Sequence, residues 1–258
     1  MPVPLELRRR LAPLVLPVRV RIRSGPNEGC WWSLASGRYL KGNIEQARMR
    51  LLEHLLHEGD ACWDVGAHHG YVALHASRCV GSTGTVHAFE PSPYNLIYLR
   101  KHLDWNARDN VHLMPLAVSA EDGTARLEES GSSRAFTLAA SGVEVETASV
   151  PSLLGARELP SPDVLKVDVE GAEADVVEAA AHHLGSACVA LVAIHSMANY
   201  TRVTAAFREA GFTVHDSAGT RRLREVETRE WGEDPDVLAV GPDAEEPGRE
   251  ILEILDQL

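Results

Sequence analysis

The chain has 258 residues, 45% of them hydrophobic and 24% charged, which is typical of one α/β domain with a modest extension. Its formal net charge of -12, from 37 acidic and 25 basic residues, would repel a phosphate backbone, so nucleic acid is not expected as a partner. The four cysteines form neither a CxxC pair nor a cluster with zinc spacing, which excludes a disulfide framework and a structural zinc site and favours a cytoplasmic location.

The N-terminus begins with an apolar and basic segment. Arg8-Arg9-Arg10 precedes a short apolar run, residues 11–17, that two prolines interrupt and further arginines follow. Neither a secretion signal nor a membrane span is therefore expected.

An N-terminal extension over residues 1–45 is predicted to contain a β-hairpin. Residues 18–23 alternate apolar with basic, and residues 24–29 are typical of a turn. Trp31 and Trp32 could roof an acceptor site, but packing of the extension onto the main domain is the preferred interpretation.

Residues 46–242 alternate strand-like apolar runs with helical patterns. The predicted strands cover 61–65, 85–89, 111–118, 164–169 and 187–194, and the predicted helices cover 46–57, 71–79, 95–106 and 172–184. This alternation implies parallel strands joined by right-handed crossovers. The expected fold class is α/β, a doubly wound, mostly parallel, Rossmann-like sheet preceded by a β-hairpin and helix extension.

The remaining segments are expected at the edges of this sheet. Residues 121–162 are polar and contain glycines, which predicts an irregular insertion or β-excursion of the kind that often holds substrate. Residues 212–215 and 236–240 predict a closing hairpin. The acidic tail, residues 243–258, carries an apolar stripe that predicts a short helix packed on the domain or on a second subunit, so a homodimer stays open.

The first strand ends in a glycine turn, Asp64-Val65-Gly66-Ala67-His68-His69-Gly70. Ligands of open parallel sheets bind beyond the carboxyl ends of the strands, and glycines let the backbone approach them closely. The Gly-x-x-x-Gly spacing differs from the Gly-x-Gly-x-x-Gly that holds a pyrophosphate, which disfavours a nicotinamide dehydrogenase. S-adenosylmethionine carries an ammonium and a sulfonium but no phosphate, and Asp64 suits those charges.

The second strand ends in Glu90-Pro91, about twenty residues beyond Gly70. A carboxylate at this place can accept hydrogen bonds from both ribose hydroxyls of a nucleoside. The alternative is an exposed Glu90 that caps the helix beginning near Pro93. The pairing with the glycine turn favours the nucleoside interpretation.

A third segment, residues 163–173, reads Asp-Val-Leu-Lys-Val-Asp-Val-Glu-Gly-Ala-Glu. Together with Asp-Val-Gly-Ala-x-x-Gly and Phe-Glu-Pro-x-Pro, it resembles the FkbM-type S-adenosylmethionine-dependent methyltransferases over about residues 37–241. The resemblance implies a class I methyltransferase fold. It also implies methyl transfer, most often to a hydroxyl oxygen of a sugar or of a secondary metabolite in natural product biosynthesis.

The resemblance implies a cofactor pocket, residue by residue. The glycine turn would shape the methionine end, Glu90 would hold the ribose, Glu45 would close over the methionine moiety, and the backbone around Ala117 would face adenine. The cofactor-binding residues so predicted are Glu45, Asp64, Gly66, Ala67, His68, Gly70, Glu90, Pro91, Ala117 and Asp168. The chain departs from the family's pattern at His68, where asparagine is usual, and at Ala193, where glutamate is usual two residues before the histidine.

Methyl transfer from a sulfonium is an in-line displacement, and an alcohol acceptor must also lose its proton. A nearby base helps by about 10²–10⁴-fold. The catalytic candidates are Asp168, Glu170 and His195, with His195 as the natural base at neutral pH and Asp168 orienting it. A histidine held only by structural hydrogen bonds is the alternative. Lys166 is expected to form a structural ion pair.

The same three candidates could bind Mg²⁺, but the spacing does not demand it and no metal site is predicted. Six other histidines, at positions 54, 57, 69, 75, 182 and 183, are expected to face solvent or cap helices. The leading hypothesis is an S-adenosylmethionine-dependent O-methyltransferase with a small-molecule acceptor and no membrane partner. Alternatives are N-methylation of an amine or peptide, and a non-catalytic module that binds S-adenosylmethionine.

Overall fold

The computed structural model describes residues 17–129, 136–138, 142–216 and 236–257. The arginine triplet Arg8-Arg9-Arg10 and the apolar residues 11–16 lie outside the described residues, as do Leu258 of the tail stripe and part of the 121–162 insertion. Within the described ranges, no helix is both long and apolar enough to cross a membrane.

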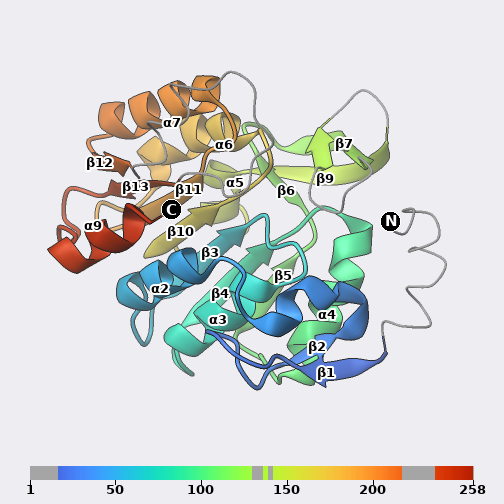
Figure 1. Ribbon diagram of the computed structural model, residues 1–258. Coiled ribbons are helices and arrows are strands. Elements are labelled where there is room, and N and C mark those ends of the chain that lie inside the picture. The colour runs from blue at the N-terminus through green and yellow to red at the C-terminus, as the bar shows by residue number, and fades with distance from the viewer. Residues whose placement is uncertain (1–16, 130–135, 139–141, 217–235, 258) are drawn as a thin grey trace.

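A seven-stranded sheet forms the centre of the molecule, in the order β12-β13-β11-β10-β3-β4-β5 (Figure 1). Its strands are β3 (Ala61–Val65), β4 (Thr85–Phe89), β5 (Val111–Met114), β10 (Val164–Val167), β11 (Val189–Ala193), β12 (Thr213–Asp216) and β13 (Asp236–Val240). Neighbours from β11 to β5 pair in parallel, whereas β13 runs antiparallel to β11 and β12. The predicted α/β class with a mostly parallel sheet is confirmed, and the strand order reverses between β10 and β3, where ligands of such sheets bind.

Helices cover both faces of this sheet, because successive strand side chains point to opposite faces. Cys62 contributes to the core beneath the first group of helices, whereas Trp63 and Val65 pack against the second group. The first group is α2 (Gln46–Leu55), α3 (Tyr71–Cys79) and α4 (Pro93–Trp105), and the second is α5 (Val150–Leu154), α6 (Glu173–Ala180), the 3-10 turn η2 (Ala181–His183) and α7 (Met197–Glu209).

The N-terminal hairpin exists as β1 (Arg19–Arg21) paired antiparallel with β2 (Trp31–Ser33), followed by the 3-10 segment η1 (Leu34–Lys41). Trp32 is fully buried and stacks on His102, with ring centroids 3.6 Å apart. For Trp32, the expected packing of the extension onto the main domain is confirmed. At the other end of the chain, α9 (Arg249–Leu255) buries its last two apolar residues against α2 in the same core.

The predicted strand 111–118 was wrong as a single element. It divides at Pro115, which has no N–H to donate to a ladder. β5 ends at Met114, and β6 (Ala117–Ser119) belongs to a separate four-stranded sheet with β7 (Gly123–Glu129), β8 (Phe136–Leu138) and β9 (Val143–Ser149). This small sheet at the side of the molecule is the β-excursion expected between the third and fourth strands (Figure 1).

The predicted strand 164–169 was also too long, since β10 ends at Val167. Alternation along a strand therefore does not place Glu170, whose φ of 55° is left-handed. The helix predicted over 172–184 likewise ends earlier, at Ala180.

The expectation that His69 and His75 face solvent or cap helices was wrong. Both are buried, because the extension and α2 cover the helix that follows β3. His69 Nδ1 lies 2.7 Å from Ser36 Oγ, and His75 Nε2 lies 3.0 Å from the carbonyl oxygen of Met49. Burial lowers the pKa of both rings, so they are neutral at pH 7.

His102 makes the fold sensitive to acid. Its Nε2 accepts from the backbone N–H of Ser33 at 3.0 Å, its Nδ1 donates to the carbonyl of His69 at 2.7 Å, and burial lowers its pKa to about 3. The unfolded chain regains an ordinary histidine pKa and so binds more protons below about pH 6.5, which means that stability decreases as the pH falls.

We expect the free energy of unfolding to fall between pH 7 and pH 5, with about 2 kcal/mol of the decrease due to His102. Urea denaturation of His102→Gln should show a shallower pH dependence, whereas the exposed His182→Gln should follow the unmodified protein. Equal slopes for all three proteins would contradict the assignment.

Candidate active site

A cavity of about 550 Å³ opens at the carboxyl ends of β3, β4 and β10, a volume typical of small-molecule sites. Most of the predicted site residues line it, namely Glu45, Gly66, Ala67, His68, Glu90, Pro91, Ala117, Asp168 and Glu170. Asp64, Gly70 and His195 do not reach its wall. The site therefore gathers at the switch point that the strand order predicts.

Gly66 begins the turn after β3 with a φ of 85°, and its N–H donates 3.0 Å to the carbonyl of Phe89. A Cβ at this position would lie 1.9 Å from the carbonyl oxygen of Asp168. Only glycine lets the ends of β3, β4 and β10 approach so closely. Gly70 has a different constraint, since its Cβ would lie 2.3 Å from Leu99 Cδ1, so it allows α3 to pack on α4.

His68 sits in the same turn with a left-handed φ of 50°. Asparagine and histidine are both enriched in this conformation, which gives a physical reason for the family's asparagine and for the tolerance of histidine here. The backbone N–H of His68 donates 2.8 Å to Glu90 Oε2, so this contact does not depend on the side chain.

Glu90 is buried, 4% exposed, and its Oε1 accepts from the N–H of Ser92 at 2.7 Å. The alternative of an exposed helix cap was wrong, because Ser92 caps α4 instead. Burial raises the pKa of Glu90 to about 7, although the backbone hydrogen bonds from Ser92 and His68 lower it. Beside it on the cavity wall, the buried Asn95 Oδ1 has no hydrogen-bond partner among the described residues.

Lys166 is 3% exposed and forms the structural ion pair that was predicted, with its Nζ 3.0 Å from Asp64 Oδ1. It also donates to the carbonyl of Gly66 at 3.2 Å. Burial lowers the pKa of Lys166, but the carboxylates of Asp64 and Asp168 raise it further, so the ammonium stays charged. Asp64 lies behind this ammonium, and its role toward a cofactor stays a prediction.

Sequence reasoning missed Arg48, a buried guanidinium on α2. Its Nε and Nη2 bind the two carboxylate oxygens of Asp236 at 2.9 and 2.8 Å. Its Nη1 lies 3.3 Å from Asp168 Oδ2 and 3.4 Å from Glu45 Oε2. The one sequence signal was a charge on the apolar face of a helix, which could not reveal a partner 188 residues away.

Asp168 stands next to both cations. Burial raises the pKa of its carboxyl, but the Lys166 ammonium and the Arg48 guanidinium together lower it below its usual value. Asp168 is therefore ionised at neutral pH and is a weak proton acceptor.

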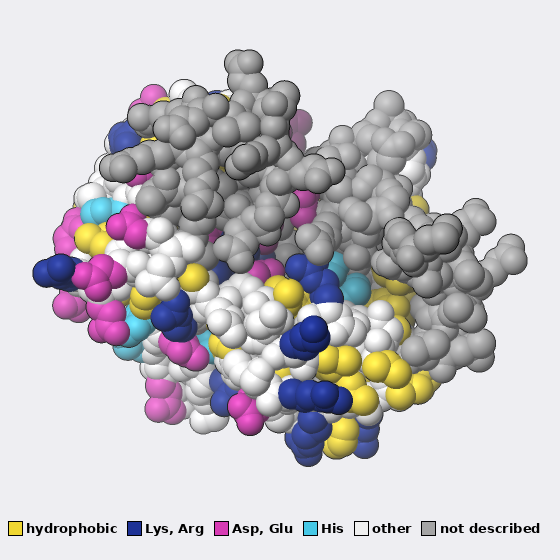
Figure 2. Space-filling view, in the orientation of Figure 1, with side chains coloured by type: hydrophobic (Ala, Val, Ile, Leu, Met, Phe, Trp, Pro, Cys, Tyr) yellow, Lys and Arg dark blue, Asp and Glu magenta, His cyan; other side chains and the backbone are white. Residues whose placement is uncertain are grey.

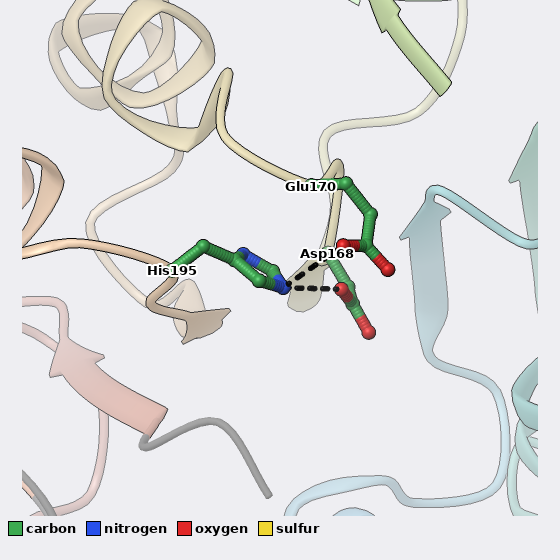
Figure 3. A group of neighbouring side chains, drawn as sticks. All are labelled: Asp168, Glu170 and His195. Atoms are coloured by element: carbon green, nitrogen blue, oxygen red, sulfur yellow. Dashed lines mark ion pairs between the residues drawn. The ribbon is translucent and has the colours of Figure 1, made fainter. Parts of the chain in front are cut away.

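His195 faces two carboxylates from the loop after β10 (Figure 3). Its Nε2 lies 3.7 Å from Asp168 Oδ1 and 3.6 Å from Glu170 Oε2, too far for good hydrogen bonds. Its Nδ1 lies 2.5 Å from Oε1 of Glu173, the first residue of α6. The carboxylate in hydrogen-bond contact with the ring is therefore that of Glu173, and not that of Asp168, which was expected to orient it.

Comparison with known proteins assigns the chain to a family. Residues 64–214, more than half of the chain, match the family model of the methyltransferase FkbM domain. The chain belongs to the FkbM methyltransferase family. A curated relative, the hexuronic acid methyltransferase AglP of Haloferax volcanii, is 34% identical to this FkbM methyltransferase over 176 residues, which are 67% of this chain and 71% of the relative.

Two solved structures share the fold with a TM-score of 0.50. The precorrin-6y C5,15-methyltransferase of Geobacter metallireducens is 18% identical and aligns over 79% of this chain and 90% of its own. An S-adenosylmethionine-dependent O-methyltransferase of Thermotoga maritima is 14% identical and aligns over 79% of this chain and 67% of its own. At these identities, the two structures support the class I methyltransferase fold alone.

The FkbM methyltransferase depends on S-adenosylmethionine, and the cavity fits a nucleoside. Glu90 and Asn95 supply acceptors on its wall, and Gly66 lines it with backbone alone. The wall near Ala117 is apolar and suits a purine ring, with side chains of Phe89, Leu116, Val118 and Leu127.

The raised pKa of Glu90 predicts how cofactor affinity depends on pH. If the ionised form of Glu90 accepts the hydrogen bonds of the ribose hydroxyls, the carboxyl must lose a proton below about pH 7 when the nucleoside binds. Calorimetry should show the Kd for S-adenosylhomocysteine rising by up to about tenfold per pH unit below pH 7.

Glu90→Gln is the matched control, because it removes this titration but leaves the ligand's own amino group to titrate in both proteins. We expect the variant to bind more weakly at pH 8 and with a smaller pH dependence. Parallel pH dependences in the two proteins would place the ribose elsewhere.

Proposed function

We propose that this FkbM methyltransferase methylates a hydroxyl oxygen of a small-molecule acceptor, a saccharide of the hexuronic acid class. The observation that carries the chemistry is that Nε2 of His195 faces Asp168 and Glu170, two carboxylates that line the cavity. The name of the curated relative, a hexuronic acid methyltransferase, supports the acceptor class.

When bound, S-adenosylmethionine supplies an electrophilic methyl group on a sulfonium. The protein's task is to place the hydroxyl and to take its proton. Asp168 Oδ1 lies 3.7 Å from Nε2 of His195. Since a hydroxyl has only one proton to donate, the acceptor hydroxyl is expected to donate to Nε2 at about 2.8 Å. Its proton then passes to His195 Nε2, and Asp168 and Glu170 stabilise the imidazolium that forms.

Ionised Asp168 serves this step as a fixed negative charge beside His195. It is held by Arg48 and Lys166, and its lowered pKa makes proton transfer to it unfavourable. His195 is therefore the better base of the two, worth about 10²–10⁴-fold in rate.

The charge distribution supports an acidic acceptor. Asp and Glu side chains gather around α9, whereas the N-terminal extension carries exposed basic side chains despite the net charge of -12 (Figure 2). Arg38 of η1 also lines the cavity, so one residue of this basic surface belongs to the cavity wall. The basic residues are Arg19, Arg21, Arg23, Arg38 and Lys41. Such a surface attracts a carboxylate and raises the local concentration of an anionic sugar.

Mg²⁺ at the His195 group is the alternative chemistry, since one ligand atom from each of the three residues lies within 4.8 Å of the others. Arg48 and Lys166 already balance the charge of Asp168, which favours a base without a metal. Turnover that vanishes with a chelator and returns with Mg²⁺ would reverse this preference.

Replacement of the base tests the proposed chemistry. With a hexuronic acid glycoside as acceptor, His195→Gln should lower kcat by about 10²–10⁴-fold without changing the affinity for S-adenosylhomocysteine. The exposed His182→Gln is the control. Normal turnover in His195→Gln, or methylation of an amine analogue in preference to the hydroxyl, would refute the proposal.

Arg38 tests the acceptor class separately. A lost charge-assisted hydrogen bond of about 1.5–3 kcal/mol predicts that Arg38→Gln raises KM for the hexuronic acid at least about tenfold. The methyl ester of the same acceptor and the exposed variant Arg208→Gln should show little change. If the affinity for S-adenosylhomocysteine falls instead, Arg38 binds the donor. Its charge would then not support an acidic acceptor.

A further inference from the structure

The carboxylate of Glu173 is the most deeply buried charge next to His195. Its side chain is fully buried, and a carboxylate removed from water must be compensated by donors. Glu173 Oε1 accepts from the N–H of Gly171 at 2.7 Å and lies 2.5 Å from His195 Nδ1. Its Oε2 accepts from the side-chain amide of Asn199. All three neighbours thus point a nitrogen at this one carboxylate.

Asn199 and Gly171 also fix the carboxylate in place. Asn199 Nδ2 donates to the carbonyl of Gly171 at 3.0 Å, so the amide joins α7 to the loop that carries Glu170. Glu173 is the first residue of α6, where the helix dipole favours a negative charge. A carboxylate in these contacts can only accept hydrogen bonds.

An acceptor at Nδ1 determines the tautomer of the ring. A neutral imidazole carries its proton on one nitrogen, so a proton held on Nδ1 by Glu173 leaves the lone pair on Nε2. Nε2 is the nitrogen that faces Asp168 and Glu170. The opposite tautomer would present an N–H there and could not take a proton from a hydroxyl.

We propose that Glu173 is the positioning residue of this methyltransferase, which sets the Nε2 lone pair of His195 toward the acceptor and stabilises the ring once it is protonated. This inference rests on the proposed function of His195 as the base. Glu173 acts only through the imidazole, because its side chain is fully buried and its carboxylate oxygens contact Gly171, His195 and Asn199.

Nitrogen-15 NMR of the histidine-labelled protein tests the tautomer directly. The His195 signals are those lost in His195→Gln. We expect a proton on Nδ1 and a lone pair on Nε2 near pH 8, and this measurement needs no variant at Glu173. A proton on Nε2 would overturn the proposal.

Kinetics test the consequence. Glu173→Gln should lower kcat by about 10²–10⁴-fold, shift the pH profile of kcat and disturb the tautomer, while the Kd for S-adenosylhomocysteine stays within about twofold. Glu178→Gln, an exposed change on the same helix, is the matched control. Should Glu173→Gln not fold, Asn199→Ala keeps the carboxylate but frees one oxygen, and a smaller loss of kcat with the same shift is expected.

The outcomes separate the two proposals. If His195→Gln abolishes turnover but Glu173→Gln leaves kcat and its pH profile unchanged, the role of Glu173 is refuted and His195 remains the base. If His195→Gln itself keeps normal turnover, the proposed function fails whatever Glu173 does.

Discussion

Two buried cations, each paired with a carboxylate, hold together the strand ends at which the cavity opens. The whole site depends on these two pairs. Lys166 binds Asp64, which joins the ends of β10 and β3, and Arg48 binds Asp236, which joins α2 to β13. Removing one partner of such a pair leaves an uncompensated buried charge, which is strongly destabilising. Both cations also reach Asp168, so the geometry of the strand ends and the charge of Asp168 have one cause.

Opposite environments give the cavity two kinds of carboxylate. Burial is the largest influence on Glu90 and raises its pKa to about 7, which would suit hydrogen bonding to a neutral ribose. Asp168 lies between cations, and its pKa is lowered, which suits a permanent negative charge beside a proton acceptor and a sulfonium. The different pKa values of the two carboxyls thus follow from which side chains surround each group, and they fit the roles proposed for Glu90 and Asp168.

The sequence predicted what depends on local pattern. The strand ends carrying Gly66, Glu90 and Asp168 meet in one cavity, because parallel strands bring their carboxyl ends to the same edge. It could not predict the pairing of Arg48 with Asp236, which only the folded chain brings together, nor the burial of His69 beneath the extension. Glu173 stood in the recognised motif, but its contact with His195 depends on how α6 begins after the loop.

A crystal structure of the complex with S-adenosylhomocysteine tests the central claim most directly, namely that the cavity between β3, β4 and β10 holds the methyl donor with its reacting end toward Asp168 and His195. The account predicts both ribose hydroxyls within about 2.6–3.2 Å of the Glu90 carboxylate and the sulfur facing Asp168. A ribose without contact to Glu90, or a sulfur turned away from Asp168 and His195, would contradict it.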